Sequence, residues 1–169
     1  RVGARMPQSL VRPVDWGEEV SEVSFYGRES EQAQLTTWIQ EDRCRLIALL
    51  GMGGIGKSAL AVTLLHQLSP FFSVAVFRSV RDAIPCEELV VDLIQTLAPE
   101  PLSEIPGPLM QRITLLLKQM QARRCFFVLD NVETLLQEGE HSGRYRVGYE
   151  GYEQLFERIA TTQHQSCVL

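Results

Sequence analysis

Hydrophobic residues occur in two kinds of pattern along this chain, and the two kinds alternate. Nearly continuous apolar runs stand at residues 44–50, 73–80 and 125–130, and a further run begins at Cys167. Continuous runs of this length that are rich in Val, Leu, Ile and Phe are typical of strands that are covered on both faces. We therefore predict four buried strands.

Segments with the spacing of amphipathic helices separate these runs. In each of them, apolar residues recur at intervals of three and four, which indicates one buried helix face. We predict helices over residues 29–40, 58–68, 86–97, 109–122 and 153–162, with a loop over 139–152. Strands that alternate with helices favour right-handed crossovers. The sequence thus predicts an α/β fold with helices on both faces of a mostly parallel sheet.

A glycine-rich segment, GMGGIGKS at residues 51–58, joins the first predicted strand to a helix. Its glycines can adopt positive φ angles and bring backbone N–H groups close to an anion, and the start of the helix adds further N–H groups. Lys57 can then reach the β- and γ-phosphates, and the Ser58 hydroxyl can bind Mg²⁺. A flexible turn with a solvated lysine is the alternative, but a strand before the loop and a helix after it favour nucleotide binding.

An aspartate, Asp130, ends the predicted strand 125–130. By itself such a residue is more often a turn former or a helix cap, but in an α/β chain with a glycine loop it is a candidate Mg²⁺ ligand. The next residue is Asn131, whose amide can orient water but cannot accept its proton. Glu133 is the nearest carboxylate, and it is either catalytic or merely solvated or capping. The predicted catalytic residues are Lys57, Asp130, Asn131 and Glu133.

Charge and composition exclude several classes of function. The net charge of -5 and the pI near 5.3 provide no basic surface for nucleic acid. The longest apolar runs are far shorter than a membrane helix, and the N-terminus does not resemble a signal peptide, so we expect a cytoplasmic protein. The four cysteines form no CxxC pair, which argues against a zinc site or a disulfide framework and favours buried, reduced thiols.

The first 24 residues differ from the rest of the chain. They contain Pro and Gly without a sustained hydrophobic period, which predicts a linker or docking arm. Residues 25–169 are the predicted domain. Because the chain starts at Arg1 and ends within the run begun at Cys167, we expect a piece of a longer protein, whose domain is incomplete on its C-terminal side.

Three motifs together resemble a known family. FYGRESEQAQL at 25–35, GMGGIGKS at 51–58 and FVLDNVE at 127–133 are similar to motifs of the NB-ARC nucleotide-binding domains of STAND signalling ATPases. The resemblance is greatest to the bacterial, cyanobacterial-type members that carry WD repeats downstream. In these, DWGEE at 15–19, RYRVGYEGY at 144–152 and HQSC at 164–167 also have counterparts, so the resemblance covers about residues 14–169.

This resemblance implies a three-layer P-loop NTPase fold and an ATP/ADP switch, in which ADP holds the protein closed and exchange for ATP with Mg²⁺ opens it for oligomerisation. It implies that Phe25, Gly27 and Arg28 lie by the adenine and ribose, and that Ser58 and Asp130 hold Mg²⁺. The nucleotide-binding residues implied in all are Phe25, Gly27, Arg28, Gly51, Met52, Gly53, Gly54, Ile55, Gly56, Lys57, Ser58 and Ala59. The implied partners are other copies of the protein and downstream helical, winged-helix and WD-repeat regions of the same polypeptide.

The chain departs from this family at Asn131, which replaces a second acidic residue, and this predicts slow hydrolysis. The resemblance also implies that the strand begun at Cys167 lies centrally, beside the strand before the glycine loop. Two other functions stay open: a nucleotide-binding scaffold without turnover, and a small-molecule P-loop kinase. The kinase would need an acceptor pocket with its own base, and the sequence shows no such constellation.

Overall fold

The computed structural model describes residues 14–17, 27–100, 102–105, 107–137 and 143–169. Phe25, most of the expected arm at 1–24 and part of the expected loop at 139–152 lie outside the described residues. The elements follow in the order α1 (Glu29–Gln40), α2 (Lys57–Leu68), η1 (Ser69–Phe71), β1 (Val74–Ser79), α3 (Cys86–Leu97), α4 (Leu109–Ala122), β2 (Cys125–Asp130), η2 (Val132–Leu135), α5 (Gly151–Thr161) and β3 (Cys167–Val168), where η marks a 3-10 helix. All five predicted helices are present.

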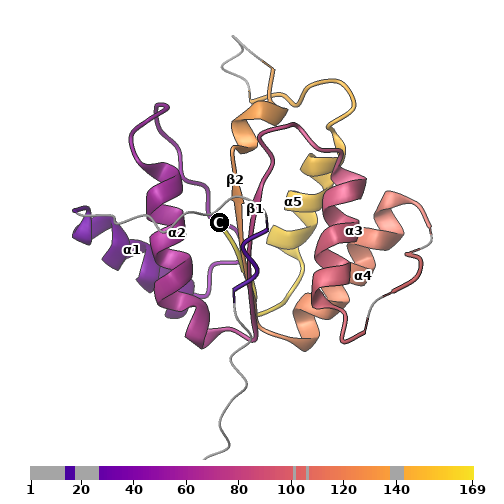
Figure 1. The fold of residues 1–169 in the computed structure, drawn as a ribbon, viewed down its shortest axis with the longest axis horizontal. Helices are drawn as coiled ribbons and strands as arrows, with labels where there is room; N and C mark the ends of the chain where they lie inside the picture. Colours follow the sequence, from indigo (N-terminus) through magenta and orange to yellow (C-terminus); the bar gives the residue numbers. More distant parts are fainter. Residues whose placement is uncertain (1–13, 18–26, 101, 106, 138–142) are drawn as a thin grey trace, which may run out of the picture.

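The described elements form three layers (Figure 1). Helices α1 and α2 cover one face of the sheet, and α3, α4 and α5 cover the other. The strand order is β1-β2-β3, and both pairs are parallel. The predicted α/β fold, with helices on both faces of a parallel sheet, is confirmed.

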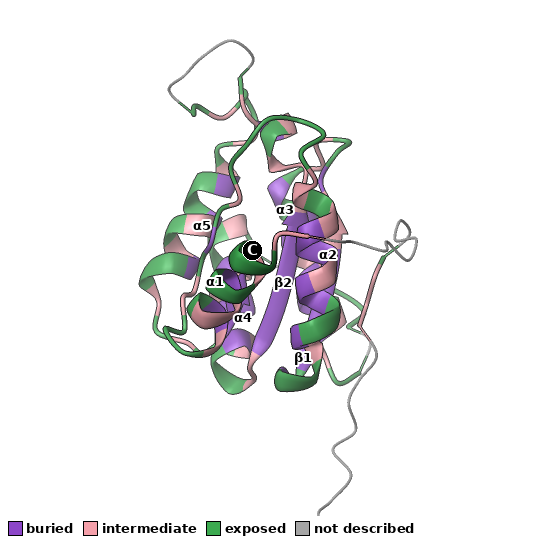
Figure 2. Ribbon diagram, turned by 90° about the vertical axis from the view of Figure 1, so that its left-hand side faces the viewer, coloured by how far each residue is buried: buried purple, intermediate pink, exposed green. Residues whose placement is uncertain are grey.

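Alternate residues of the strands enter two separate hydrophobic cores. In β2, Cys125, Phe127 and Leu129 pack with α3, α4 and α5, whereas Phe126 and Val128 pack with α1 and α2. Both cores need apolar side chains, and this explains why the strand reads as a continuous apolar run. Figure 2 shows β2 buried along almost its whole length, with exposed residues on the outer faces of the helices.

The segment 44–50 does not form the predicted buried strand. In the part of the chain that the structure describes, it makes one isolated parallel bridge, from Leu46 to Val168, and Leu50 is 89% exposed. A strand requires a ladder of hydrogen bonds to its neighbours, and this segment is joined to β3 by two backbone hydrogen bonds, from Ile47 to Val168 and from Val168 to Arg45. The predicted place of the strand at Cys167 is confirmed, since β3 lies between β2 and the segment before the glycine loop.

Helix α5 begins at Gly151, two residues before the predicted start. A Cβ atom at Gly151 would lie 2.7 Å from a methyl carbon of Leu109 and 3.1 Å from the Cβ of Cys86. A larger residue at this position would therefore have to displace the Leu109 side chain and the start of α3, and glycine lets α5 approach α3 and α4 without that displacement. The sequence pattern placed Gly151 in a loop, because the hydrophobic spacing does not reveal that α5 packs closely against α3 and α4 at this residue.

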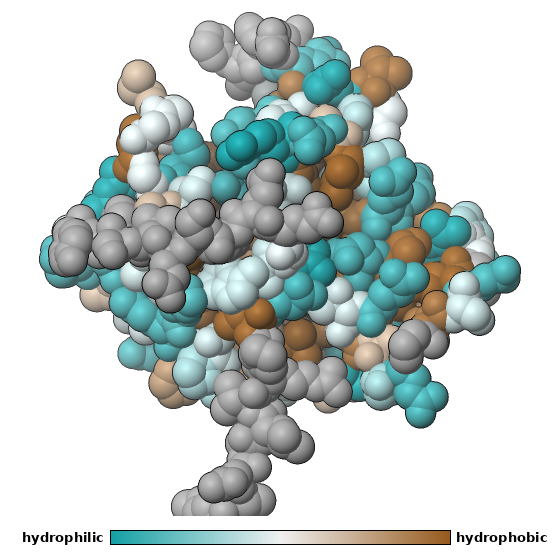
Figure 3. All heavy atoms as spheres, viewed as in Figure 1, coloured by the Kyte–Doolittle hydropathy of each residue, from teal (hydrophilic) through white to brown (hydrophobic). Residues whose placement is uncertain are grey.

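The surface is mixed in character. On the face in Figure 3, hydrophobic residues occur in small groups between hydrophilic ones. Among the described residues, no helix has both the length and the apolar composition to cross a lipid bilayer.

The four cysteines are free thiols; Cys86, Cys125 and Cys167 are buried, and Cys44 is half-buried. The predicted burial therefore holds for three of the four. Burial disfavours the charged thiolate and raises the pKa of Cys86 to about 12, of Cys125 to about 11 and of Cys167 to about 12.

We expect an alkylating reagent at pH 8 to modify Cys44 at least about tenfold faster than the other three cysteines, because the reactive species is the thiolate. Mass spectrometry of the proteolysed chain measures each site. In guanidinium chloride all four should react at similar rates. Rapid native alkylation of Cys167 would contradict the burial of β3.

Candidate functional site

The glycine loop has backbone angles that favour glycine at two positions. Gly54 has φ +78° and Gly56 has φ +90°, in the left-handed region that other residues adopt only with strain. A Cβ atom at Gly53 or Gly54 would meet nothing within 4 Å. The loop therefore borders open space at Gly53 and Gly54.

The start of α2 faces the same space. Gly56 is its N-cap residue, and no side chain of the described residues caps the helix there. The first N–H groups of a helix lack partners within the helix, and they carry a partial positive charge. Such an end suits a phosphate group.

The Lys57 side chain folds back on the start of the glycine loop. Its ammonium donates hydrogen bonds to the carbonyl oxygens of Gly51 at 2.8 Å and of Met52 at 3.1 Å. The side chains of Met52 and Ile55 are exposed, and Ala59 is half-buried in the first turn of α2. The loop thus offers its backbone and one cation to a ligand.

Ser58 and Asp130 meet although 72 residues separate them in the sequence. The Ser58 hydroxyl donates a hydrogen bond of 2.9 Å to Oδ1 of Asp130. Helix α2 packs on the sheet next to β2, and the carboxyl end of β2 points to the start of α2. A hydroxyl and a carboxylate oxygen side by side are the type of ligand that Mg²⁺ prefers, so this pair fits the metal.

A cavity of about 640 Å³ joins the loop to the ends of the strands. It brings together all four residues that the sequence nominated for catalysis, namely Lys57, Asp130, Asn131 and Glu133. Much of its remaining wall is apolar and comes from the segment before the loop, from β2 and from β3.

Asn131 has a left-handed backbone conformation, with φ 63° and ψ 30°. Asn and Asp adopt this conformation more readily than other residues with a side chain. The amide is held from the neighbouring strand, because the Ser79 hydroxyl donates a hydrogen bond of 3.1 Å to Oδ1 of Asn131. Its NH₂ group therefore remains available to donate in another direction.

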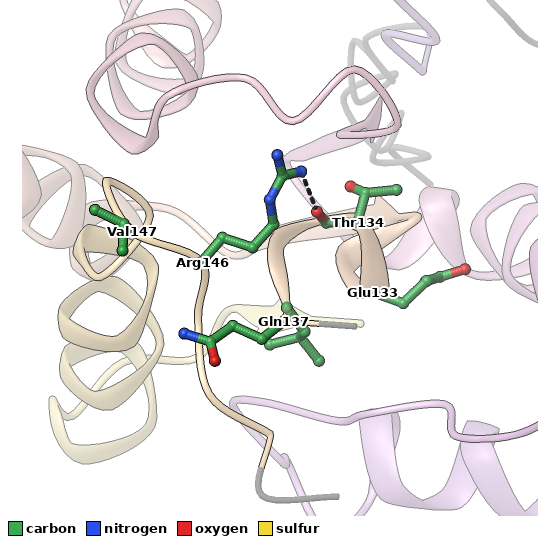
Figure 4. Close-up of a pocket in the computed structure, with 6 residues that line it drawn as sticks. Glu133, Thr134, Gln137, Arg146 and Val147 are labelled. Carbon is green, nitrogen blue, oxygen red and sulfur yellow. Dashed lines mark hydrogen bonds between the residues drawn. The ribbon is translucent and has the colours of Figure 1, made fainter. Parts of the chain in front are cut away.

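Glu133 lies in η2, two residues after Asn131. It lines the main cavity and also a second hollow of about 460 Å³ beside η2. Figure 4 shows that its side chain extends away from Arg146, whose guanidinium donates a hydrogen bond of 3.1 Å to the carbonyl oxygen of Thr134. The described structure thus leaves the Glu133 carboxylate at the boundary of the site, whereas Asn131 follows the strand directly.

Arg28 connects the segment before α1 to the glycine loop. Its guanidinium donates a hydrogen bond of 2.5 Å to the carbonyl oxygen of Ile55. The carbonyl oxygen of the adjacent Gly27 accepts a hydrogen bond from the Gln32 side chain at 3.0 Å. Arg28 and Gly27 are thus next to the loop, and Phe25 lies outside the described residues.

The comparison with protein families decides which fold family this site belongs to. Residues 24–145 match the model of the AAA ATPase domain. The chain belongs to the AAA ATPase domain family. It is also 43% identical, over 163 residues, to a WD repeat-containing protein of Nostoc sp.; the match covers 92% of this chain and 13% of that relative.

Sequence reasoning missed one residue of this AAA ATPase domain site. Ser79 is the last residue of β1 and pairs in register with Asp130, and so it reaches the residue after Asp130. The signal was present in the sequence, since parallel strands end at the same edge of a sheet and a polar residue stands near the end of the run 73–80.

Replacing Ser79 by Ala removes the hydrogen bond that its hydroxyl donates to Asn131 and the one of 3.3 Å that it accepts from the N–H of Arg81, and should lower the free energy of unfolding by about 1 kcal/mol. Ser79→Thr keeps a hydroxyl and should retain most of the stability. Ser73→Ala, at an exposed serine just before β1, is the control. Urea denaturation measures all three, and equal stability of Ser79→Ala and the control would show that these hydrogen bonds contribute nothing.

Proposed function

We propose that this chain is the ATP/ADP-binding module of a STAND-type signalling switch. The observation that carries the proposal is the hydrogen bond of 2.9 Å between Ser58 and Asp130. It joins a phosphate-binding loop to the end of a buried strand, which is the arrangement that binds a nucleotide together with Mg²⁺ in P-loop proteins.

Each part of the site has a defined role in this proposal. The backbone of residues 51–56 and the start of α2 bind the phosphate chain, and Lys57 places its charge on the β- and γ-phosphates. Ser58 and Asp130 hold Mg²⁺, which when bound neutralises charge on these phosphates. Gly27 and Arg28 lie beside the loop, where they fit the side of the adenine and ribose.

Asn131 supports slow turnover. Its amide can orient a water molecule or donate to the γ-phosphate, but it cannot take the proton of the attacking water. A switch needs an ATP-bound state that lasts longer than the assembly it triggers. A site without a base next to Asp130 suits that need, because hydrolysis is then slow. Conformational change and association with other copies of the protein would be the output.

The comparisons support a larger protein around this module. The chain spans 13% of the length of the WD repeat-containing relative, and the motifs at 25–35, 51–58 and 127–133 resemble those of NB-ARC domains. We propose that helical, winged-helix and WD-repeat regions of the same polypeptide respond to the bound nucleotide. A fold alone does not establish such a function, so the proposal rests on the site and the motifs.

Asn131 also favours a second candidate, a nucleotide-binding scaffold without turnover. The two differ only in whether bound ATP is hydrolysed. A small-molecule kinase is disfavoured, because the position next to Asp130 holds an amide where an acceptor hydroxyl would need a base.

Calorimetric titration with nucleotide tests the binding site. Lys57→Ala should abolish measurable Mg·ATP binding, because the charge on the β- and γ-phosphates is lost. Asp130→Ala should weaken Mg·ATP binding much more than metal-free ADP binding, since Asp130 acts on the nucleotide through the metal. The other lysine, Lys118, is exposed on α4, and Lys118→Ala should bind as the unsubstituted chain does.

Two outcomes would contradict this assignment. Unchanged Mg·ATP affinity in Lys57→Ala would exclude the loop as the phosphate site. Equal losses of Mg·ATP and ADP binding in Asp130→Ala would show that Asp130 is structural.

Single-turnover hydrolysis in the full-length protein tests the role of Asn131. The unsubstituted protein should hydrolyse ATP well below the roughly 1 to 100 s⁻¹ that is typical of kinases. Asn131→Asp supplies a base in a backbone conformation that Asp tolerates, and should raise the rate about tenfold or more. Glu133→Gln should have little effect. The reverse pattern would assign the base to Glu133, and fast turnover of the unsubstituted protein would refute the slow switch.

A further inference from the structure

Residues 14–17, which we name the edge strap, lie along the side of β1 that faces away from β2. Asp15 forms a parallel bridge with Val76. Its N–H donates to the carbonyl oxygen of Ala75 at 3.0 Å, and its carbonyl oxygen accepts from the N–H of Phe77 at 2.8 Å. Asp15 thus continues the parallel hydrogen-bond pattern of the sheet beyond its outermost described strand.

The side chains of the strap alternate as those of a strand do. Val14 and Trp16 pack against the core beneath α1 and α2. The Trp16 ring lies 4.3 Å from the ring of His66 on α2 and 6.4 Å from that of Phe77, measured between centroids. Trp16 therefore contacts the strand and the helix that follows the glycine loop at the same time.

Asp15 points to the opposite face, where it meets Arg78. Nη2 of Arg78 lies 2.9 Å from Oδ2 of Asp15, and Nε lies 2.5 Å from Oδ2 of Asp92 on α3. Burial by itself would lower the pKa of Arg78, but the hydrogen bonds to the two carboxylates raise it above its usual value. Of the two carboxylates that pair with the largely buried Arg78 guanidinium, Asp15 thus comes from the strap.

We propose that the edge of β1, with His66 on one side and Arg78 on the other, is a docking site for the edge strap of the same chain, and that the docked strap strengthens nucleotide binding. The edge strap suits this site because it is an extended segment with an acidic residue, Asp15, next to an aromatic residue, Trp16. The effect on nucleotide rests on the proposed function, whereas the docking does not.

The strap contacts two elements that reach the site, α2 and β1. Helix α2 begins with Lys57 and Ser58 and carries His66 near its other end, and a helix transmits a displacement along its length because its backbone hydrogen bonds keep it rigid. Arg78 directly precedes Ser79, which holds Asn131. A docked strap restricts the positions of α2 and of the end of β1. Nucleotide binding then costs less conformational entropy, because these elements are already ordered.

Amide hydrogen exchange of Phe77 in the 169-residue chain tests the docking, because this N–H donates to the strap. Trp16→Ala should speed its exchange about tenfold or more, since the edge then opens more often. Trp16→Phe keeps a ring on His66 and should restore most of the protection. The matched control is Trp38→Ala, at the partly exposed tryptophan of α1, which should leave Phe77 unchanged.

Nucleotide titration of the same variants tests the coupling. Trp16→Ala and Asp15→Ala should raise the Kd for Mg·ADP about fivefold, at the lower end of typical coupling between sites. Asp82→Ala, at an exposed carboxylate after β1, should not change it. Coupling is reciprocal, so saturating Mg·ADP should slow Phe77 exchange by the same factor in the unsubstituted chain.

Three results are decisive. Equal Phe77 exchange in Trp16→Ala and Trp38→Ala would overturn the docking. Faster exchange in Trp16→Ala with an unchanged Kd would overturn the coupling. Absence of nucleotide binding in the unsubstituted chain would overturn the proposed function and the coupling with it, and the Phe77 exchange rates, measured without nucleotide, would still decide the docking.

Discussion

The parallel pairing of β1 with β2 is the constraint on which the nucleotide site depends. Its register places Ser79 opposite Asp130, so the two strands end together, and Ser79 can hold Asn131 beside the cavity that Asp130 lines. Helix α2 packs against this pair of strands, and its first turn brings Ser58 to Asp130. A shift of register by one residue would turn every side chain of β2 to the other core, and the Asp130 carboxylate would leave the site.

Two hydrophobic cores stabilise that register from opposite sides. The apolar residues of β1 and β2 alternate between the core beneath α1 and α2 and the core beneath α3, α4 and α5. The apolar residues that bury the sheet therefore also fix the position of the polar residues at its end. The site itself is made of backbone with unusual angles, at Arg28, Gly54, Gly56 and Asn131. Such conformations persist only where the surrounding structure determines them.

The edge strap extends the same principle to the outer side of the sheet. It pairs with β1 through the backbone, while Trp16 and Asp15 contact α2 and Arg78 on the two faces. An exposed sheet edge is open to pairing with other chains, and the strap occupies part of the β1 edge. A segment that the sequence marked as a linker or docking arm is thus partly integrated into the sheet.

The sequence by itself determined the alternation of helices and strands and the glycine loop, and it nominated Lys57, Ser58 and Asp130 as candidate site residues. These follow from hydrophobic period and from spacing within a short segment, which are local properties. The sequence did not reveal that the segment 44–50 forms a single bridge, at Leu46, with the rest of the described chain, that α5 starts at Gly151, or that Ser79 holds Asn131. Each of these depends on which segments become neighbours in space, and only tertiary packing decides that. The same reason separates Asn131 from Glu133, because the position of a side chain three residues beyond the end of β2 depends on how the chain turns after the strand.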